Sequence, residues 1–297
     1  MLSFIELGRL GRLGNQLFQY AALRGAGVKT GYEIKIPEPA RRHWQGQDCL
    51  LGEFNLEVDY LQDADMQLLT HRYVEPTANH FHPRTFELSD GTDLYGFFQS
   101  YRYFAHCEEQ IRREFQLPQQ ICDEAATQLT KVRESGDRDA EVVSVHMRRG
   151  DNTDGTNPEY VNFYGQNDVL TPESDYGRYF YKALEMFEGK RVKYLVFSGG
   201  SRRGGDGNLT DIEWCKKNFN GDNVYYAEGN RDLVDFSLMS QCHHNIACHM
   251  TSFGWWAAFL NNNPGKIVVT PENYTVPDDG RQHYGFYPPS WRTIDGN

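Results

Sequence analysis

The stretch VVSVHMRRGD, residues 142–151, decides the fold class of this chain. An apolar, β-branched run ends there in one histidine, two arginines and one aspartate, which is typical of a buried strand that carries charge to the edge of a sheet. Ligands of open α/β sheets bind beyond the carboxyl ends of the strands, and two guanidinium groups at that place suit a diphosphate leaving group. The stretch therefore predicts a nucleotide-sugar site. Structural ion pairs of His146, Arg148 and Arg149 with nearby carboxylates explain this segment equally well.

The segments around this strand alternate between strand and helix patterns. Apolar runs predict strands at residues 2–7, 33–36, 141–147, 192–198, 223–226, 243–248 and 266–270. Helical periodicity predicts helices at residues 16–26, 106–115, 119–135, 173–188, 210–218, 231–241 and 252–261. Beyond residue 137 the alternation is regular, as in a parallel sheet covered by helices. The fold class is therefore α/β, with a Rossmann-like second lobe and a first lobe of the same kind but weaker pattern.

Length and pattern divide the chain into two lobes. Its 297 residues are long for one core, and the polar stretch 134–137 resembles a linker. We therefore expect an N-terminal lobe at 1–136 and a C-terminal lobe at 137–297, with a C-terminal tail that can return to the first lobe. Residues 37–98 show no sustained period and predict short helices and loops.

Charge and composition exclude several kinds of partner. Thirty lysines and arginines against 41 aspartates and glutamates give a net charge of −11, which argues against a nucleic-acid surface and against an anionic membrane. No apolar run approaches the roughly 20 residues that span a bilayer, and the first residues lack the apolar core of a signal peptide. We expect a cytoplasmic protein without membrane insertion.

The cysteines and the acidic loops do not predict a metal. Six cysteines are scattered through a chain far larger than a disulfide-stapled domain, so reduced thiols are expected. CHH at residues 242–244 and CH at residues 248–249 contain zinc-ligand types, but their spacing fits no common finger and a buried strand lies between them. The run 151–155 resembles the start of a calcium loop, yet its twelfth position is Asn162, where a bidentate glutamate is needed.

Three blocks of sequence, in this order, resemble one enzyme family: GRLGNQLFQYAA at residues 11–22, HMRRGD at residues 146–151, and HNIA at residues 244–247 followed by WWAAFL at residues 255–260. The chain is similar to the α-1,2-fucosyltransferases of glycosyltransferase family 11. The resemblance implies a GT-B fold, with two Rossmann-like lobes that face a cleft and with GDP-fucose held mainly by the C-terminal lobe. It also implies metal-independent transfer of L-fucose from GDP-β-L-fucose to the 2-hydroxyl of a galactose-containing glycan acceptor, with inversion and an α-1,2 linkage.

The resemblance gives the second and third blocks a role in binding the donor. Arg148 is expected to contact the β-phosphate, because a GT-B enzyme without a metal needs a side-chain cation to stabilise the departing GDP. His146 is expected to touch the nucleoside or a phosphate. Thr251 and Ser252 precede a helix, where hydroxyls and backbone N–H groups together form an anion site. Capping of that helix by either hydroxyl is a compatible alternative.

An inverting transfer also needs a base that takes the proton of the acceptor hydroxyl, and a carboxylate is the usual choice. Asp151 belongs to the matched motif and is the catalytic candidate from that motif. It is equally a candidate partner for Arg149, which follows Arg148 directly and should face the other side of the strand as a structural residue. Other carboxylates lie in the loop that follows, at Asp154, Glu159 and Asp168.

The first block is expected to line the sugar side of the cleft. By resemblance it places Arg12, Gly14, Asn15 and Gln16 opposite the transferred fucose or the acceptor. The alternative is a plain helix start, which Asn15 caps while the apolar residues after it pack.

The chain departs from the family pattern in two places. The family carries Phe-Ser-Asp-Asp-Ile-Glu-Trp after the next strand, whereas FSGG at 197–200 is separated here from DIEW at 211–214 by a glycine- and arginine-rich insertion. Related fucosyltransferases use an aspartate near this point to read guanine, so Asp211, Asp206 or backbone groups take that task. One residue is also added before the tryptophans of the third block, which leaves the register of Thr251 against Ser252 open.

These departures keep two alternatives open. One is a GT-B transferase that uses a different nucleotide sugar, because the guanine motif is broken. The other is a catalytically silent sugar-binding protein. The acceptor itself is not specified by any motif, and its specificity is expected to reside in residues 37–98 and in the loop 152–172.

Overall fold

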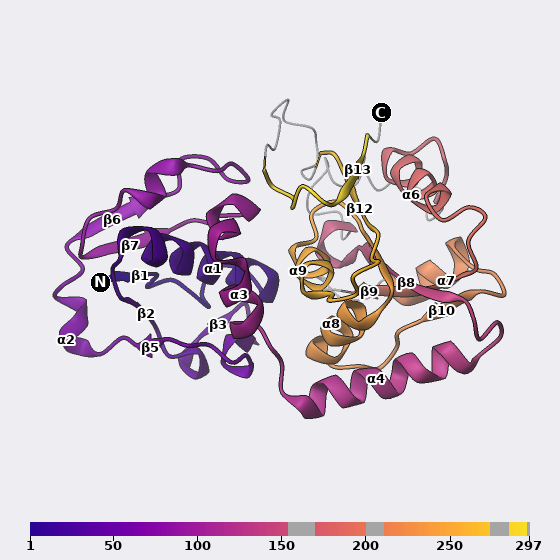
Figure 1. Cartoon of the computed structure of the whole chain (residues 1–297), viewed down its shortest axis with the longest axis horizontal. Helices are drawn as coiled ribbons and strands as arrows, with labels where there is room; N and C mark the ends of the chain where they lie inside the picture. Colours follow the sequence, from indigo (N-terminus) through magenta and orange to yellow (C-terminus); the bar gives the residue numbers. More distant parts are fainter. Residues whose placement is uncertain (154–169, 200–210, 274–284, 296–297) are drawn as a thin grey trace. The chain divides into compact units, whose positions relative to one another are not determined.

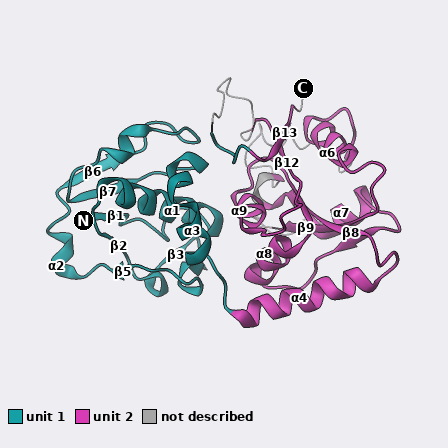
Figure 2. Ribbon diagram, in the orientation of Figure 1, with its two compact units in different colours: residues 1–118, 283–289 teal, residues 119–282, 290–297 magenta. Residues whose placement is uncertain are grey.

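The computed structural model describes residues 1–153, 170–199, 211–273 and 285–295 (Figure 1). The chain forms two compact units, coloured separately in Figure 2. Unit 1 contains residues 1–118 and 283–289, and unit 2 contains residues 119–282 and 290–297.

Unit 1 is built on a parallel sheet of five short strands in the order β5-β2-β1-β7-β6. Its strands are β1 (Leu2–Ser3), β2 (Ile34–Ile36), β5 (Asp59–Tyr60), β6 (His71–Val74) and β7 (Thr92–Tyr95). Its helices are α1 (Leu13–Thr30), α2 (Asp63–Met66) and α3 (Glu108–Glu114), and a small hairpin joins β3 (His43–Trp44) to β4 (Gln47–Asp48). The Rossmann-like character expected of this lobe is thus present.

Three strands of this sheet lie in the region that the sequence predicts as short helices and loops. β5, β6 and β7 have only two to four residues each, and most residues of β5 and β6 are exposed. Such short strands carry no readable alternation of apolar and polar residues. Their place in the sheet is decided by pairing with β1 and β2, which the local sequence does not reveal.

Helix α1 is longer than predicted and nearly encased by unit 1. It begins at Leu13, directly after a turn in which Gly11 adopts φ +82°, and ends at Gly31 in the left-handed conformation typical of a helix C-cap. Thirteen of its residues are buried, so it shows little amphipathic contrast. This explains why the helical periodicity of the sequence predicts only residues 16–26, the central part of α1.

Unit 2 contains a parallel sheet of six strands in the order β10-β9-β8-β11-β12-β13. Its strands are β8 (Glu141–Arg148), β9 (Val192–Gly199), β10 (Val224–Tyr226), β11 (His244–Ala247), β12 (Val268–Pro271) and β13 (Arg292–Ile294). Its helices are α4 (Gln119–Glu134), α6 (Asp175–Glu185), α7 (Asp211–Asn218), α8 (Asp232–Gln241) and α9 (Ser252–Leu260). The predicted alternation is confirmed element by element, and among the strands and helices of the described residues β13 is the one that was not predicted.

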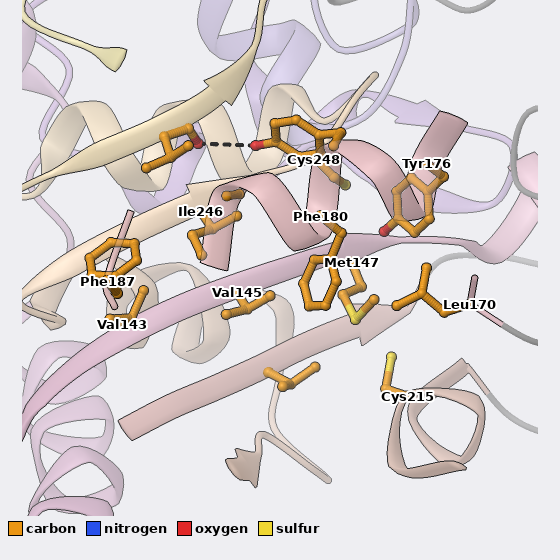
Figure 3. Packing of buried hydrophobic residues seen from close by; sticks show 14 of the residues in the cluster. Val143, Val145, Met147, Leu170, Tyr176, Phe180, Phe187, Cys215, Ile246 and Cys248 are labelled. Carbon is orange, nitrogen blue, oxygen red and sulfur yellow. Dashed lines mark hydrogen bonds between the residues drawn. The ribbon is translucent and has the colours of Figure 1, made fainter. Parts of the chain in front are cut away.

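The two faces of β8 carry different chemistry. Val143, Val145 and Met147 point into a buried cluster with Tyr176 and Phe180 of α6, as Figure 3 shows. The residues between them face the other side of the sheet, the side of α8 and α9. The apolar face anchors the strand, and the opposite face is where His146 and Arg148 project.

The boundary between the units lies earlier than the predicted residue 136. Helix α4 packs beside α8, and Gln241 Nε2 donates to the Cys122 carbonyl at 3.0 Å. Lys193 Nζ of β9 donates to the last carbonyls of α4, at 2.8 and 3.0 Å. These non-local contacts attach α4 to unit 2. At the other end, the Ser100 hydroxyl donates to the Gly285 carbonyl at 2.8 Å, which attaches that part of the tail to unit 1.

Among the described residues, no helix is long and apolar enough to cross a membrane. The expected cytoplasmic location stays a prediction. All six cysteines are free, and five of them are buried. Within the described part of the chain no three His, Cys, Asp or Glu side chains are grouped as a metal site would require.

Candidate functional site

The strand order of unit 2 marks one place on its sheet. From β8 the chain builds outward through β9 and β10, then crosses back to build β11, β12 and β13 on the other side. The order therefore reverses between β8 and β11, and ligands of open α/β sheets bind outside the carboxyl ends of the strands at such a switch point. β8 ends there in His146 and Arg148, and β11 leads there to Thr251 and helix α9.

Arg148 is held at the end of β8 by backbone atoms. Its Nη1 donates to the Arg149 carbonyl at 3.0 Å and to the Gly199 carbonyl of β9 at 3.2 Å. Its own N–H donates to Cys248 Sγ at 2.9 Å. The two carbonyl contacts orient the guanidinium without neutralising its charge, so a fixed cation stands at the switch point.

His146 lies beside this cation as a neutral imidazole. The residue is 8% exposed, and its Nδ1 lies 2.6 Å from Thr251 Oγ1. Burial, and secondarily the charge of Arg148, lowers the pKa of His146 to about 3. At neutral pH the histidine can donate one hydrogen bond and accept another, but it adds no second positive charge.

The N-terminus of α9 is the third component of the site. Thr251 caps the helix by accepting the Gly254 N–H at 3.0 Å. A Cβ at Gly254 would lie 2.7 Å from His146 Nδ1, so glycine is what lets the imidazole approach this turn. The first turn contains no acidic residue, and its partial positive charge therefore adds to that of Arg148. Ser252 is the first residue of the same helix.

Arg149 and Asp211 meet on the other face of β8. Arg149 Nε lies 3.6 Å from Asp211 Oδ1, and its guanidinium lies 3.7 Å from the ring centroid of Trp214. Asp211 Oδ2 accepts the Gly150 N–H at 3.0 Å. Arg149 is thus on the face opposite to Arg148, as predicted, and the partner that the structure gives it is Asp211. The guanine-reading role expected of Asp211 stays a prediction, although both of its oxygens face groups of the protein.

Unit 1 has a switch point of its own, between β1 and β7, and the first sequence block lies there. Two features require glycine at position 11: its positive φ, and the 2.3 Å distance at which a Cβ would lie from Asn15 Nδ2. Asn15 lies in the first turn of α1, and its Oδ1 accepts from Nε2 of Gln99, in the segment after β7, at 2.7 Å. Gln99 was missed by sequence reasoning because its partner is far away in the chain.

The other members of the first block take different places. Gln16 is 1% exposed, and its Nε2 donates to the Gly11 carbonyl at 3.0 Å, so the structure gives it a role in holding the turn that differs from the predicted sugar contact. Arg12, half-buried, occupies the N-cap position without a side-chain capping bond. Asn15 is therefore not the cap that the alternative reading expected. Gly14 is buried in the first turn of α1.

Glu75, just after β6, is a buried carboxyl at the same edge that the sequence did not single out. Its Oε2 accepts the N–H groups of Phe97 and Phe98 at 2.7 and 3.0 Å. Burial raises its pKa to about 7 in spite of these bonds. It holds the segment that leads to Gln99. A lone glutamate in an irregular region carries no sequence signal for this role.

The sequence of this chain matches a family model along almost its whole length, from residue 6 to residue 295. The chain belongs to glycosyl transferase family 11. As a family 11 member it is a glycosyltransferase, and all three sequence blocks lie in or next to the elements described above.

Relatives of this family 11 protein include two animal enzymes. Galactoside alpha-(1,2)-fucosyltransferase 1 from Homo sapiens is 33% identical over 281 residues, covering 90% of this chain and 67% of that protein. Galactoside alpha-(1,2)-fucosyltransferase 2 from Bos taurus is 28% identical over 285 residues, covering 92% of this chain and 72% of that protein.

Solved structures show weaker similarity to this family 11 protein. Fucosyltransferase NodZ from Bradyrhizobium aligns with a TM-score of 0.49 and 12% identity over 86% of this chain and 92% of that one. POFUT1 in complex with GDP aligns with a TM-score of 0.48 and 10% identity over 91% of this chain and 97% of that one.

One of the predicted candidates for the catalytic base lies in the described part of the chain. Asp151 belongs to the short turn Gly150–Thr153 that follows β8. The other carboxylates considered for this role, and the alternative guanine reader, lie outside the described residues: Asp154, Glu159, Asp168 and Asp206.

Proposed function

We propose that this chain transfers L-fucose from GDP-β-L-fucose to the 2-hydroxyl of a galactoside, with inversion at the anomeric carbon. The names of its relatives supply the reaction, since they are galactoside alpha-(1,2)-fucosyltransferases. The observation that carries the proposal is the fixed guanidinium of Arg148 at the switch point of unit 2, beside a neutral His146 and the first turn of α9.

The chemistry of the transfer explains this arrangement. As the bond between fucose and GDP breaks, negative charge grows on the β-phosphate. A preorganised cation beside that phosphate stabilises the transition state more than the ground state, because the charge is larger there. Arg148 supplies the cation, and the N–H groups and dipole of α9 supply further favourable charge. No metal is needed in this scheme.

The proposal gives unit 1 the acceptor. Its switch point carries the amides of Asn15 and Gln99, and amide groups suit the hydroxyls of a sugar better than they suit a diphosphate. Asn15, braced by Gln99, is the side chain that we assign to contact the fucose or the galactoside, with Arg12 beside it.

The experiment measures GDP release from GDP-fucose with excess EDTA, using methyl β-galactoside as acceptor and its 2-deoxy analogue as the matched control. We expect release only with the acceptor that has a 2-hydroxyl, no effect of EDTA, and an α-1,2 linkage in the product by NMR. Arg148→Ala should slow release about 100- to 1000-fold. Turnover with GDP-mannose in place of GDP-fucose would support another nucleotide-sugar donor instead, and release that stops with EDTA would contradict the metal-independent scheme.

A further inference from the structure

One peptide group connects Asp211 to Arg148. The carbonyl of Arg149 accepts from Arg148 Nη1 at 3.0 Å, and the N–H of Gly150 donates to Asp211 Oδ2 at 3.0 Å. These two atoms belong to the same peptide unit. Because a peptide unit is planar and trans, its C=O and N–H point in opposite directions, and fixing one end fixes the other.

Asp211 is itself fixed on the far side. Its Oδ1 lies 3.6 Å from Arg149 Nε, and the Arg149 guanidinium stacks on Trp214 at 3.7 Å. Asp211 also begins α7, where a carboxylate is favoured by the helix dipole. With 7% of the residue exposed, the carboxylate is part of the protein interior.

The charges of this arrangement are as informative as its geometry. Two consecutive arginines end the strand, and their charges repel each other. Asp211 lies beside Arg149 on one face of the sheet, opposite to the face on which Arg148 projects. The Asp211 carboxylate that accepts the Gly150 N–H also polarises this peptide group. Hydrogen bonds that follow one another in series, from Arg148 through the peptide to Asp211, strengthen one another.

We infer that Asp211 is a positioning residue for Arg148: it acts through the peptide between residues 149 and 150 and holds the guanidinium in the place that binds the diphosphate. The inference rests on the proposed function, since it assumes that Arg148 meets the diphosphate of the donor. It differs from the guanine-reading role that family resemblance gives to an aspartate near this point, because the effect of Asp211 would be felt at the phosphates and not at the base.

The test compares two nucleotides that share the base and differ by one phosphate. The affinities of GDP and GMP are measured by calorimetry for the wild-type chain, Asp211→Asn and Asp211→Ala. For Asp211→Ala we expect GDP to bind about tenfold more weakly, the loss of one charge-assisted hydrogen bond, while GMP binding stays nearly constant. Asp211→Asn keeps the shape of the side chain and a neutral acceptor, so we expect its affinity for GDP to fall about threefold and its affinity for GMP to stay unchanged.

A matched control and a double variant separate positioning from general stability. Asp235 lies in the first turn of α8 and accepts from Asn230 Nδ2 at 2.8 Å, so Asp235→Asn removes a comparable carboxylate from unit 2 without changing GDP affinity. In an Arg148→Ala background, Asp211→Asn should cause no further loss of GDP affinity, because the group that it positions is gone.

The outcomes distinguish the two levels of the argument. If the wild-type chain does not bind GDP, the proposed function fails. If the wild-type chain binds GDP but the Asp211 variants bind it equally well, only the inference about Asp211 fails. If the variants lose GDP and GMP affinity to the same extent, Asp211 reads the guanine and the inference is overturned. If Asp211→Ala does not fold, Asp211→Asn decides, since it preserves the packing.

Discussion

Unit 2 gathers positive charge at the switch point of its sheet, whereas unit 1 gathers amides and one buried carboxyl at the corresponding place. In unit 2 the elements are Arg148, a neutral His146 and the first turn of α9. In unit 1 they are Asn15 and Gln99, with Glu75 fixing the segment behind them. Both sheets are parallel, and in both the strand order reverses beside the first strand of the unit, β1 in unit 1 and β8 in unit 2.

The difference shows that the topology supplies the place and the side chains supply the chemistry. A parallel sheet with a reversed order offers a site at its carboxyl edge whatever residues occupy that edge. In unit 2 a guanidinium and a helix N-terminus make that place suitable for an anion. In unit 1 the amides make it suitable for hydroxyls. Substitutions at the two switch points test whether donor and acceptor binding are divided between the units in this way.

The largest effect is expected for Arg148→Ala. Removing a preorganised group that stabilises growing charge costs about 100- to 1000-fold in kcat in comparable enzymes. We expect a loss of that size in the rate of GDP release and weaker GDP binding, with the apparent affinity for the galactoside unchanged. Steady-state kinetics with both substrates varied, and calorimetry with GDP, measure these effects. A loss confined to the acceptor side would contradict the assignment of the diphosphate to unit 2.

The second prediction concerns the fit of His146 against α9. In Gly254→Ala the new Cβ falls 2.7 Å from His146 Nδ1 and 3.2 Å from Thr251 Oγ1. Overpacking of this kind costs about 1–3 kcal/mol, which outweighs the gain in helix propensity. We expect a lower melting temperature together with weaker GDP binding. Gly265→Ala is the control, because its Cβ meets only an ordinary contact at 3.7 Å. Unchanged GDP affinity in Gly254→Ala would remove His146 and Thr251 from the donor site.

The third prediction concerns unit 1. Gln99→Leu removes the hydrogen bond to Asn15 Oδ1 and leaves the volume nearly constant. One such bond contributes about 1 kcal/mol, so we expect a several-fold increase in the KM for the galactoside and no change in the Kd for GDP. The same pair of measurements used for Arg148→Ala checks it. An equal change in both constants would mean that the two switch points do not divide donor from acceptor.

The smallest effect is a difference in pH dependence between the two units. Glu75 has a pKa raised to about 7 from an ordinary 4.5, so the folded chain binds its proton more tightly than the unfolded chain does. This contribution to stability is full below about pH 4.5 and is lost as the pH rises through 7. Glu75→Gln should therefore become more stable relative to wild type as the pH rises from 5 to 8.

Two histidines of unit 2 give the stability a pH dependence of the opposite sign. His146 and His249 have pKa values lowered to about 3 from 6.5, chiefly by burial. The unfolded chain takes up these protons first, so unit 2 loses stability as the pH falls from about 6.5 toward 3. Hydrogen exchange, measured during denaturant unfolding, gives the stability of each unit separately. A Glu75→Gln variant with the same pH profile as wild type would show that this carboxyl is already ionised in the folded chain.

The sequence predicted unit 2 far better than unit 1. Strands such as β8 and β9 have eight residues with apolar runs, and their pattern is readable without knowing their neighbours. The strands β5 and β6 have two and four residues and are largely exposed. Their existence depends on pairing with distant strands, and local pattern holds no record of that pairing.

The candidate site was predicted to the same uneven extent. His146, Arg148 and Thr251 are near neighbours in the structure because parallel strands end at one edge, which the sequence pattern implies. The hydrogen bonds of Gln16 and Asp211 to backbone groups were not predicted. Gln16 donates to the Gly11 carbonyl in the turn before α1, and Asp211 accepts the Gly150 N–H after the end of β8.

By itself the sequence determined the α/β class, the alternation of unit 2, the family and the residues at the end of β8. These follow from short-range patterns and motifs, which are properties of the chain read in order. Only the tertiary structure decided which carboxylate compensates Arg149, which amide braces Asn15, and to which unit α4 belongs. Such pairings join residues far apart in sequence, and they are selected by burial and hydrogen bonding once the sheets have formed.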